Sequence, residues 1–191
     1  MQGAEWGVTE WLIAGGLAGL TLVVIWLYNG LVRRRNQVKN AWSQIDVQLK
    51  RRHDLIPNLV SAVKDYMAYE QETLTKVINA RNAAVSASGP QAAIPAEAVL
   101  GGLLGKLFAL MENYPDLKAN QNVAQLMEEL STTENKIAFA RQFYNDSVMD
   151  LNNAVHMFPS NLVALVFRFA EGVHFATPDE EKAVPKVSLR S

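Results

Sequence analysis

Twenty-two consecutive residues near the N-terminus, 11–32, carry no charge, and this run constrains the fold more than any other feature of the chain. As an α-helix the run would span about 33 Å, close to the thickness of the hydrocarbon core of a bilayer. Glu10 comes directly before it and Arg33 directly after it. A core helix of a soluble domain is rarely so long and so cleanly bounded by charge. The run therefore predicts one transmembrane helix at 11–32.

The two ends of this span differ in charge, and the difference predicts its orientation. Acidic residues precede the span, whereas three arginines follow it. Cytoplasmic flanks of membrane helices carry an excess of Lys and Arg, and aromatic residues gather at both interfaces. We therefore expect residues 1–10 to lie outside the cytoplasm and the chain from residue 33 onward to lie inside it. The predicted interface residues are Trp11, Trp26, Tyr28, Arg33, Arg34 and Arg35.

Small residues mark one face of the predicted span. Gly15 and Gly19 form a GxxxG step, with Ala14 and Ala18 beside them. Small residues four apart let two membrane helices approach closely, but glycine is also common in such helices. The sequence leaves two interpretations open: a self-association face, which would make the chain a homo-oligomer, or a chance spacing.

Composition excludes several classes of function. The chain has no Cys, so disulfides, thiolate catalysis and zinc–thiolate sites are excluded. Its net charge of −1 gives no general attraction to nucleic acid. Residues 33–81 hold ten Lys and Arg against five Asp and Glu, whereas residues 82–191 hold eight against twelve. Because the basic part adjoins the span, membrane lipid is the predicted contact and nucleic acid is not.

Apolar periodicity predicts that the rest of the chain is helical. From residue 38 to 78, apolar residues recur at steps of three and four, which is typical of a helix with one buried face. Pro57 falls inside this run and predicts a kink near 53–57. Residues 83–95 are rich in Ala, Ser, Gly and Pro without any charge, and this composition indicates a linker.

Two more helices are predicted at 96–113 and 120–158, with a short break between them that makes them antiparallel neighbours. The predicted fold class is all-α: one N-terminal transmembrane helix followed by a long antiparallel bundle of three to four helices over residues 33–170. Residues 171–191 read as an irregular tail.

The direction of the third helix depends on the linker at 83–95. If the linker is a simple distal turn, the third helix points away from the membrane. If the chain climbs back along the first helix, the third helix returns toward the membrane and buries more of its length. We favour the second arrangement, which would bring a short apolar piece near the bilayer. That piece comprises Leu162, Val163, Leu165, Val166 and Phe167, and it could cap the bundle core, touch lipid or touch another protein.

Polar residues on the predicted third helix need an explanation, because Asn and Thr are poor helix formers. Asn145 and Asn152 could satisfy buried partners or line a contact with another chain, and so could Thr132, Asn135 and Asn153. We expect Arg141 to pair with an acid such as Glu134 or Asp65. We expect His53 to be a seam or surface residue.

The sequence contains no recognisable reaction chemistry. Helical metal sites use Glu-x-x-His pairs, and only Glu171-x-x-His174 fits that spacing, without a second copy. Phosphate loops, dinucleotide fingerprints and nucleophile elbows are missing. We therefore predict no catalytic, cofactor-binding or metal residues, no cofactor, and a protein that is not an enzyme.

The chain after residue 26 resembles the LemA family. The resemblance rests on ordered motifs: the stretch 28–34, RRHDLIPNLV at 51–60, NYPDLKANQN at 113–122, EELSTTENKIAFARQFYND at 128–146, FPSNLVA at 158–164 and PKVSL at 185–189. It implies a single-pass protein of the bacterial inner membrane with a cytoplasmic helical bundle, and relatives that include a membrane protein of magnetosomes. It implies no catalytic residues.

Two functional hypotheses follow. The first is a membrane-anchored scaffold or adaptor that self-associates and organises partners at the membrane. The second is a sensory or regulatory module that couples a signal to another membrane protein, such as a protease, with Pro57 as the movable element.

Overall fold

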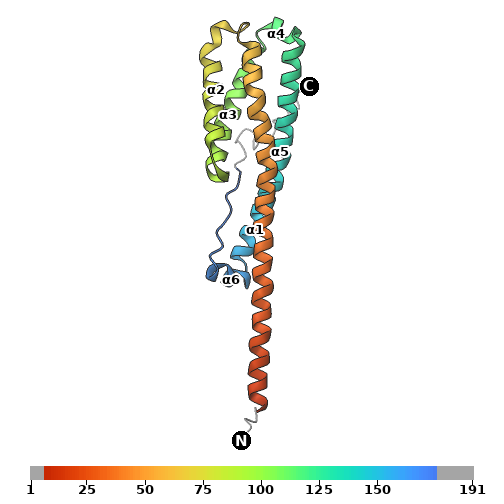
Figure 1. Ribbon diagram of the computed structural model, residues 1–191, viewed down its shortest axis with the longest axis vertical. Coiled ribbons are helices and arrows are strands. Elements are labelled where there is room, and N and C mark those ends of the chain that lie inside the picture. Colours follow the sequence, from red (N-terminus) through yellow and green to blue (C-terminus); the bar gives the residue numbers. More distant parts are fainter. Residues whose placement is uncertain (1–6, 176–191) are drawn as a thin grey trace, which may run out of the picture. The chain divides into compact units, whose positions relative to one another are not determined.

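The computed structural model describes residues 7–175 of the chain, and in that range it contains helices and no strand (Figure 1). Residues 1–6 and 176–191 lie outside the described range, so most of the predicted tail lies outside it too. The helices are α1 (Val8–Val63), α2 (Gln71–Ser86), α3 (Gly89–Met111), α4 (Pro115–Ala119), α5 (Gln121–His156) and α6 (Ser160–Val166), with a 3₁₀ turn at Ala68–Glu70. The predicted all-α fold class is confirmed.

The chain divides into two compact units that share α1 and α5. The anchor unit comprises residues 1–40 and 146–172, and the bundle unit comprises residues 41–145 and 173–191. Each unit has its own apolar core.

In the bundle unit, α1, α2, α3 and α5 run alternately up and down (Figure 1). Hydrogen bonds between helices agree with this order. Arg81, near the end of α2, binds the His53 carbonyl of α1, and Glu134 of α5 binds the neighbouring Arg52. The core consists of side chains that are at most 5% exposed, which include Ile56, Leu59, Val63, Leu74, Val77, Leu100, Leu107 and Leu130. Each such side chain stabilises the fold by about 1.5–3 kcal/mol relative to exposure.

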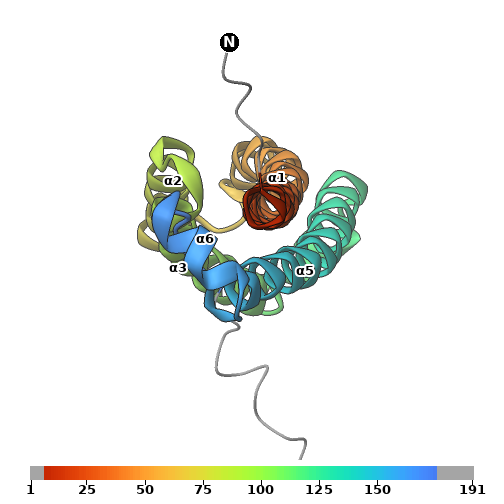
Figure 2. The same cartoon turned by 90° about the horizontal axis from the view of Figure 1, so that it is seen from below.

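The predicted linker at 83–95 is wrong. Only Ala87 and Ser88 separate α2 from α3, and the two helices lie side by side (Figure 2). Gly89 has φ +77°, a conformation that glycine adopts without strain. The proline after it occupies the first turn of α3, where its missing N–H costs nothing. Ala84 and Ala93 are buried, and their small side chains allow the two helices to pack closely.

The chain therefore returns along α1 as the helix α2, and not as an extended linker. After α3 and α4, α5 runs antiparallel to α1, as in the arrangement we favoured. Pro57 lies inside α1 without interrupting it, and the predicted kink stays a prediction.

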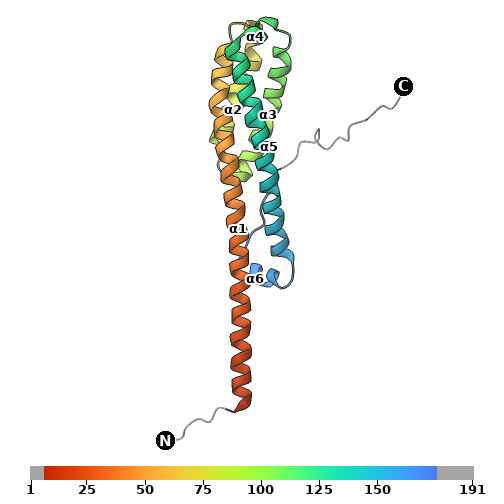
Figure 3. The ribbon, with the colours of Figure 1, turned by 90° about the vertical axis from the view of Figure 1, so that its right-hand side faces the viewer.

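The anchor unit holds the first part of α1, the last turns of α5, and α6 (Figure 3). Its core consists of Leu31, Ala154, Val163, Ala164 and Phe169, with Val24, Leu27, Tyr28, Val32 and Val155 packed against it. Residues 11–23 of α1 are exposed throughout. Of the helices described, α1 and α3 are long and apolar enough to cross a membrane by length and composition alone. A third of the apolar window of α3 is buried, with Leu100, Leu104 and Leu107 in the bundle core, whereas the apolar window of α1 is entirely unburied.

Candidate functional site

The apolar piece predicted at 162–167 has two different sides. Val163 and Ala164 are 6% and 2% exposed and close the core of the anchor unit. Leu165 and Val166 are 78% and 73% exposed. The exposed set continues into the preceding turn, and we call it the α6 face: Met157, Phe158, Leu162, Leu165, Val166 and Phe167. Val163 thus behaves as a core cap and Phe167 is half exposed, whereas Leu162, Leu165 and Val166 remain largely uncovered within the described chain.

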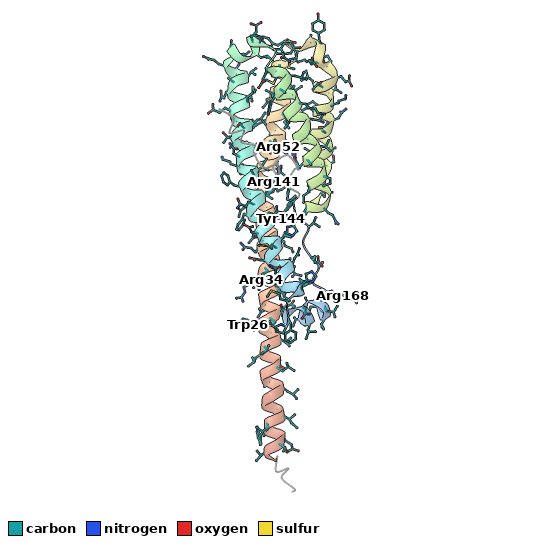
Figure 4. All side chains as sticks on the ribbon, turned by 180° about the vertical axis from the view of Figure 1, so that it is seen from behind. Trp26, Arg34, Arg52, Arg141, Tyr144 and Arg168 are labelled. Carbon is teal, nitrogen blue, oxygen red and sulfur yellow. The ribbon has the colours of Figure 1, made fainter. Side chains whose placement is uncertain are left out.

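Aromatic contacts hold α6 to α1 at the Arg33 end of the predicted span. The ring of Tyr28 lies 4.8 Å from that of Phe167 and 5.7 Å from that of Phe169, measured between centroids. The guanidinium of Arg35 sits 5.2 Å above the ring of Phe169. Trp26, Arg34 and Arg168 gather at the same end of the anchor unit (Figure 4). Trp26, Tyr28 and the arginines that follow the span therefore lie at the same end of the anchor unit as the apolar piece, whereas Trp11 lies at the other end of the predicted span.

The small residues of the span are not explained by packing within the described chain. A Cβ atom added at Gly15, Gly16 or Gly19 would meet nothing within 4 Å. Ala14 and Ala18 are exposed as well. The predicted self-association face is therefore open.

A cluster of buried charges lies in the bundle unit, where Figure 4 marks Arg52. Arg52 and Glu97 are each 1% exposed and form an ion pair. Arg52 also donates to Glu134 at 2.5 Å, and the Nε2 atom of His53 lies 2.7 Å from the Glu97 carboxylate. His53 is buried in the helix seam, which was one of the two places expected for it. Sequence reasoning placed Glu97 on the predicted helix at 96–113 but missed its role, because it lies 44 residues from His53.

Opposite effects act on the Glu97 carboxyl. Burial alone would raise its pKa, but the hydrogen bond with His53 and the charge of Arg52 outweigh burial and lower the pKa below its usual value of 4.5. Glu97 is therefore ionised at neutral pH. Its charge is matched by Arg52, although the Nε atom of Arg52 is buried without a hydrogen-bond partner among the described residues. Among residues 7–175 no group of three or more His, Cys, Asp or Glu could hold a metal ion.

Arg141 extends this cluster, and its predicted partner Glu134 is confirmed at 3.6 Å. The Arg141 guanidinium also lies 4.5 Å from the centroid of the Phe175 ring. Such a cation–π contact typically contributes about 0.5–1 kcal/mol at partly exposed sites. The side chain thus links α5 to the segment that follows α6.

Two asparagines of α5 bind the backbone of that segment. Within the anchor unit, Asn152 accepts a hydrogen bond from the Gly172 N–H at 2.8 Å and donates to its carbonyl at 3.1 Å. Within the bundle unit, Asn145 makes the same pair of bonds with Phe175, at 2.8 and 3.0 Å. Of the two interpretations that the sequence left open, these bonds support partners within the chain for both asparagines. Thr132, Asn135 and Asn153 are exposed, and nothing in the structure explains them.

A shallow groove of about 440 Å³ runs between α1 and α5 on the bundle unit. Phe139 and Val47, from the two helices, are 75% and 64% exposed at its rim. Its lining is Gln44, Val47, Gln48, Lys136, Phe139, Ala140 and Phe143. Sequence reasoning missed the groove. The available signal was the placement of Val47 and Phe139 outside the buried stripes of their helices.

Comparison with known proteins finds the LemA family and relatives named LemA and MamQ. The model of the LemA family matches residues 41–189. Protein LemA of Metamycoplasma hominis is 30% identical over 140 residues, which cover 71% of this chain and 63% of that protein. Magnetosome protein MamQ of Magnetospirillum gryphiswaldense is 23% identical over 185 residues, covering 83% of this chain and 68% of that protein. Magnetosome protein MamQ 2 of Paramagnetospirillum magneticum is 24% identical over 174 residues, covering 78% and 64%. The chain thus spans roughly two thirds of the length of these relatives.

Proposed function

Because the chain belongs to the LemA family, we propose that it is a membrane-anchored, non-enzymatic helical scaffold that self-associates and organises partner proteins at the bacterial inner membrane. The chain is a helical membrane protein with an N-terminal apolar helix. The proposal adds the inner membrane, an N-terminus outside, a cytoplasmic bundle and the scaffold role. The positive-inside rule supports this orientation, because the arginines follow the span directly.

The observation that carries the scaffold role is the exposed apolar groove between α1 and α5. Phe139 is large and apolar, and because it is 75% exposed, little of its surface is buried against its own chain. Aromatic side chains at the centre of an interface contribute much of its binding energy. The occupant we assign to the groove is a second copy of this chain. The helix α1 that lines the groove also carries the open Gly15–Gly19 face, so a second copy would meet the same helix twice.

The polar chemistry of the described chain supports a scaffold better than an enzyme. The Arg52–Glu97–His53 cluster consumes its charges internally, and the two α5 asparagines bind backbone groups. Catalytic groups instead face a pocket where a substrate can reach them. The groove is lined by two glutamines, one lysine and otherwise apolar side chains, a composition suited to protein contact.

The first test is the mass of the protein after extraction in a mild detergent, measured by light scattering during size exclusion. We expect a discrete assembly of several chains. A monomer would contradict the self-association part of the proposal.

The second test assigns the contact. The double variant Gly15→Leu and Gly19→Leu should reduce crosslinking in native membranes, because leucine blocks close helix approach. Gly16→Leu, one position away from that face, is the matched control. Phe139→Ser should also weaken the assembly, and Val99→Ser, at an exposed position of α3, is its control. Unchanged crosslinking of the double glycine variant would remove the membrane helix from the interface.

Pro57 favours a second candidate, a regulatory module that couples a signal to another membrane protein such as a protease. Proline removes one helical hydrogen bond inside α1 and leaves a point where the helix can bend. Under this candidate, Pro57→Ala would change the set of proteins crosslinked to the chain in intact membranes, at equal amount and helicity. Identical sets from both proteins would exclude it.

A further inference from the structure

The α6 face lies on the outside of the anchor unit, and its six members are each at least half exposed. The two side chains that α6 turns inward, Val163 and Ala164, anchor it to α1. The helix thus has one apolar side in the core and a second apolar side uncovered within the described chain. A contiguous apolar surface of this kind usually meets a partner or a membrane.

The depth of α6 follows from the residues on which it packs. Those residues, from Val24 to Val32, form the last turns of the predicted span and cover about 12 Å of helix. The whole uncharged run is about 33 Å long, which is only just enough to cross the hydrocarbon core. Its last turns must therefore lie within the membrane, because the remaining residues would be too short to cross it. A helix packed on them lies at their depth, which matches the roughly 5–10 Å insertion of interfacial helices.

Arginines surround this surface where lipid phosphates would lie. Arg168 follows the end of α6 with φ +55°, a left-handed backbone conformation that is sterically unfavourable for residues other than glycine. Its side chain is exposed and has no polar partner among the described residues. Arg33, Arg34 and Arg35 are exposed at the same end. Guanidinium groups bind phosphate oxygens through two parallel hydrogen bonds.

We propose that the α6 face is a lipid-binding surface, inserted among the acyl chains of the leaflet at the Arg33 end of the span, with Arg168 on the headgroup phosphates. The chain then meets the membrane twice, once through the span and once through this short interfacial helix. The depth of Val24 to Val32 selects lipid over a soluble protein as the occupant.

Because the chain has no cysteine, a single spin label can report the surroundings of α6 in the full protein. Val166→Cys is labelled with a nitroxide and reconstituted into vesicles of phosphatidylethanolamine and phosphatidylglycerol. Two exposed positions serve as references: Ile25→Cys on the span and Val85→Cys on α2, which are 50% and 51% exposed. Oxygen concentrates in lipid and a nickel chelate stays in water, so their relaxation effects separate the two environments.

We expect the label at Val166 to be accessible to oxygen and protected from nickel, as at Ile25, with the reverse at Val85. A label at Val166 that behaves like Val85 would overturn the proposal, while Ile25 reports separately on the span. Poor access to both reagents, with dipolar broadening that disappears on dilution with unlabelled protein, would assign the face to a second copy and also overturn it. Leu165→Cys repeats the measurement at a second exposed position.

Discussion

Arg81 donates a hydrogen bond to the acceptor that Pro57 leaves open. In an uninterrupted α-helix, the N–H of residue 57 would bind the carbonyl of His53, but proline has no N–H. In this structure the Nε atom of Arg81, from α2, binds that carbonyl oxygen at 3.0 Å. A neighbouring helix thus satisfies the gap in α1. This bond is one reason why α1 can pass through Pro57.

Removing Arg81 should therefore cost more stability when Pro57 is present than when it is replaced. We expect Arg81→Ala to lower the free energy of unfolding by about 1–3 kcal/mol, the cost of an unsatisfied buried carbonyl. In a Pro57→Ala background the new N–H binds the carbonyl, so the cost should shrink. Thermal and denaturant unfolding in detergent, followed by circular dichroism, measures the natural chain, the two single variants and the double variant. Lys76→Ala, at an exposed position of α2, is the control. Equal costs of Arg81→Ala in both backgrounds would contradict the coupling.

Arg52 and Arg51 are neighbours in sequence with different burial, and they provide a matched pair. Arg52 is 1% exposed beside Glu97, whereas the side chain of Arg51 is 52% exposed and pairs with Glu129 at 3.5 Å. Arg52→Met should destabilise the bundle by about 3–5 kcal/mol, because it leaves a buried carboxylate without its cation. Arg51→Met should cost about 0–1 kcal/mol.

The combined variant Arg52→Met with Glu97→Leu tests the cause. It removes both charges together, so its unfolding free energy should lie closer to that of the natural chain than the sum of the single changes predicts. If Arg52→Met and Arg51→Met unfold alike, the buried ion pair is not stabilising in the way described.

Most of the helices could be predicted from the sequence because their signals are local, but the break between α1 and α2 at residues 64–70 was missed, since the apolar spacing continues across it. Apolar spacing within one helix reports its buried face, and an uncharged run reports a span, without knowledge of any distant residue. The Arg52–Glu97 pair is a different case, since its partners lie 45 residues apart on helices whose register the spacing does not determine. The same limit applies to the two clamps made by Asn145 and Asn152, whose backbone partners follow 20 to 30 residues later.

The error at 83–95 has a physical origin. Small uncharged residues are typical of flexible linkers, but they also permit close packing of two helices, as Ala84 and Ala93 do here. Composition cannot separate these cases, because the difference lies in what surrounds the segment. The α6 face illustrates the same point, since the periodicity of seven residues does not say which side meets the core.

Stability should depend on acid pH through Glu97. Its pKa is lowered from 4.5 in the folded chain, because the hydrogen bond with His53 and the charge of Arg52 outweigh the opposing effect of burial. A lowered carboxyl pKa contributes stability that is complete above the unfolded pKa and is lost as pH falls through the folded pKa. We therefore expect the unfolding temperature to drop as pH falls below about 4.5. Glu97→Gln should be less stable at neutral pH and should show a smaller drop, and exposed Glu128→Gln should match the natural chain. A drop of equal size in Glu97→Gln would assign the acid sensitivity to other groups.

Asn152 and Asn153 are adjacent on α5, and only Asn152 binds the Gly172 backbone. Two hydrogen bonds contribute about 0.5–1.5 kcal/mol each. Asn152→Ala should therefore speed hydrogen exchange at the Gly172 N–H by about tenfold or more, because each 1.4 kcal/mol is a factor of ten. Asn153→Ala, on the exposed side, should leave that rate unchanged. Exchange measured by mass spectrometry on the reconstituted protein resolves the segment. Equal rates in the two variants would mean that the segment is held by the contacts of Phe169 with the anchor core, and that the amide clamp adds little.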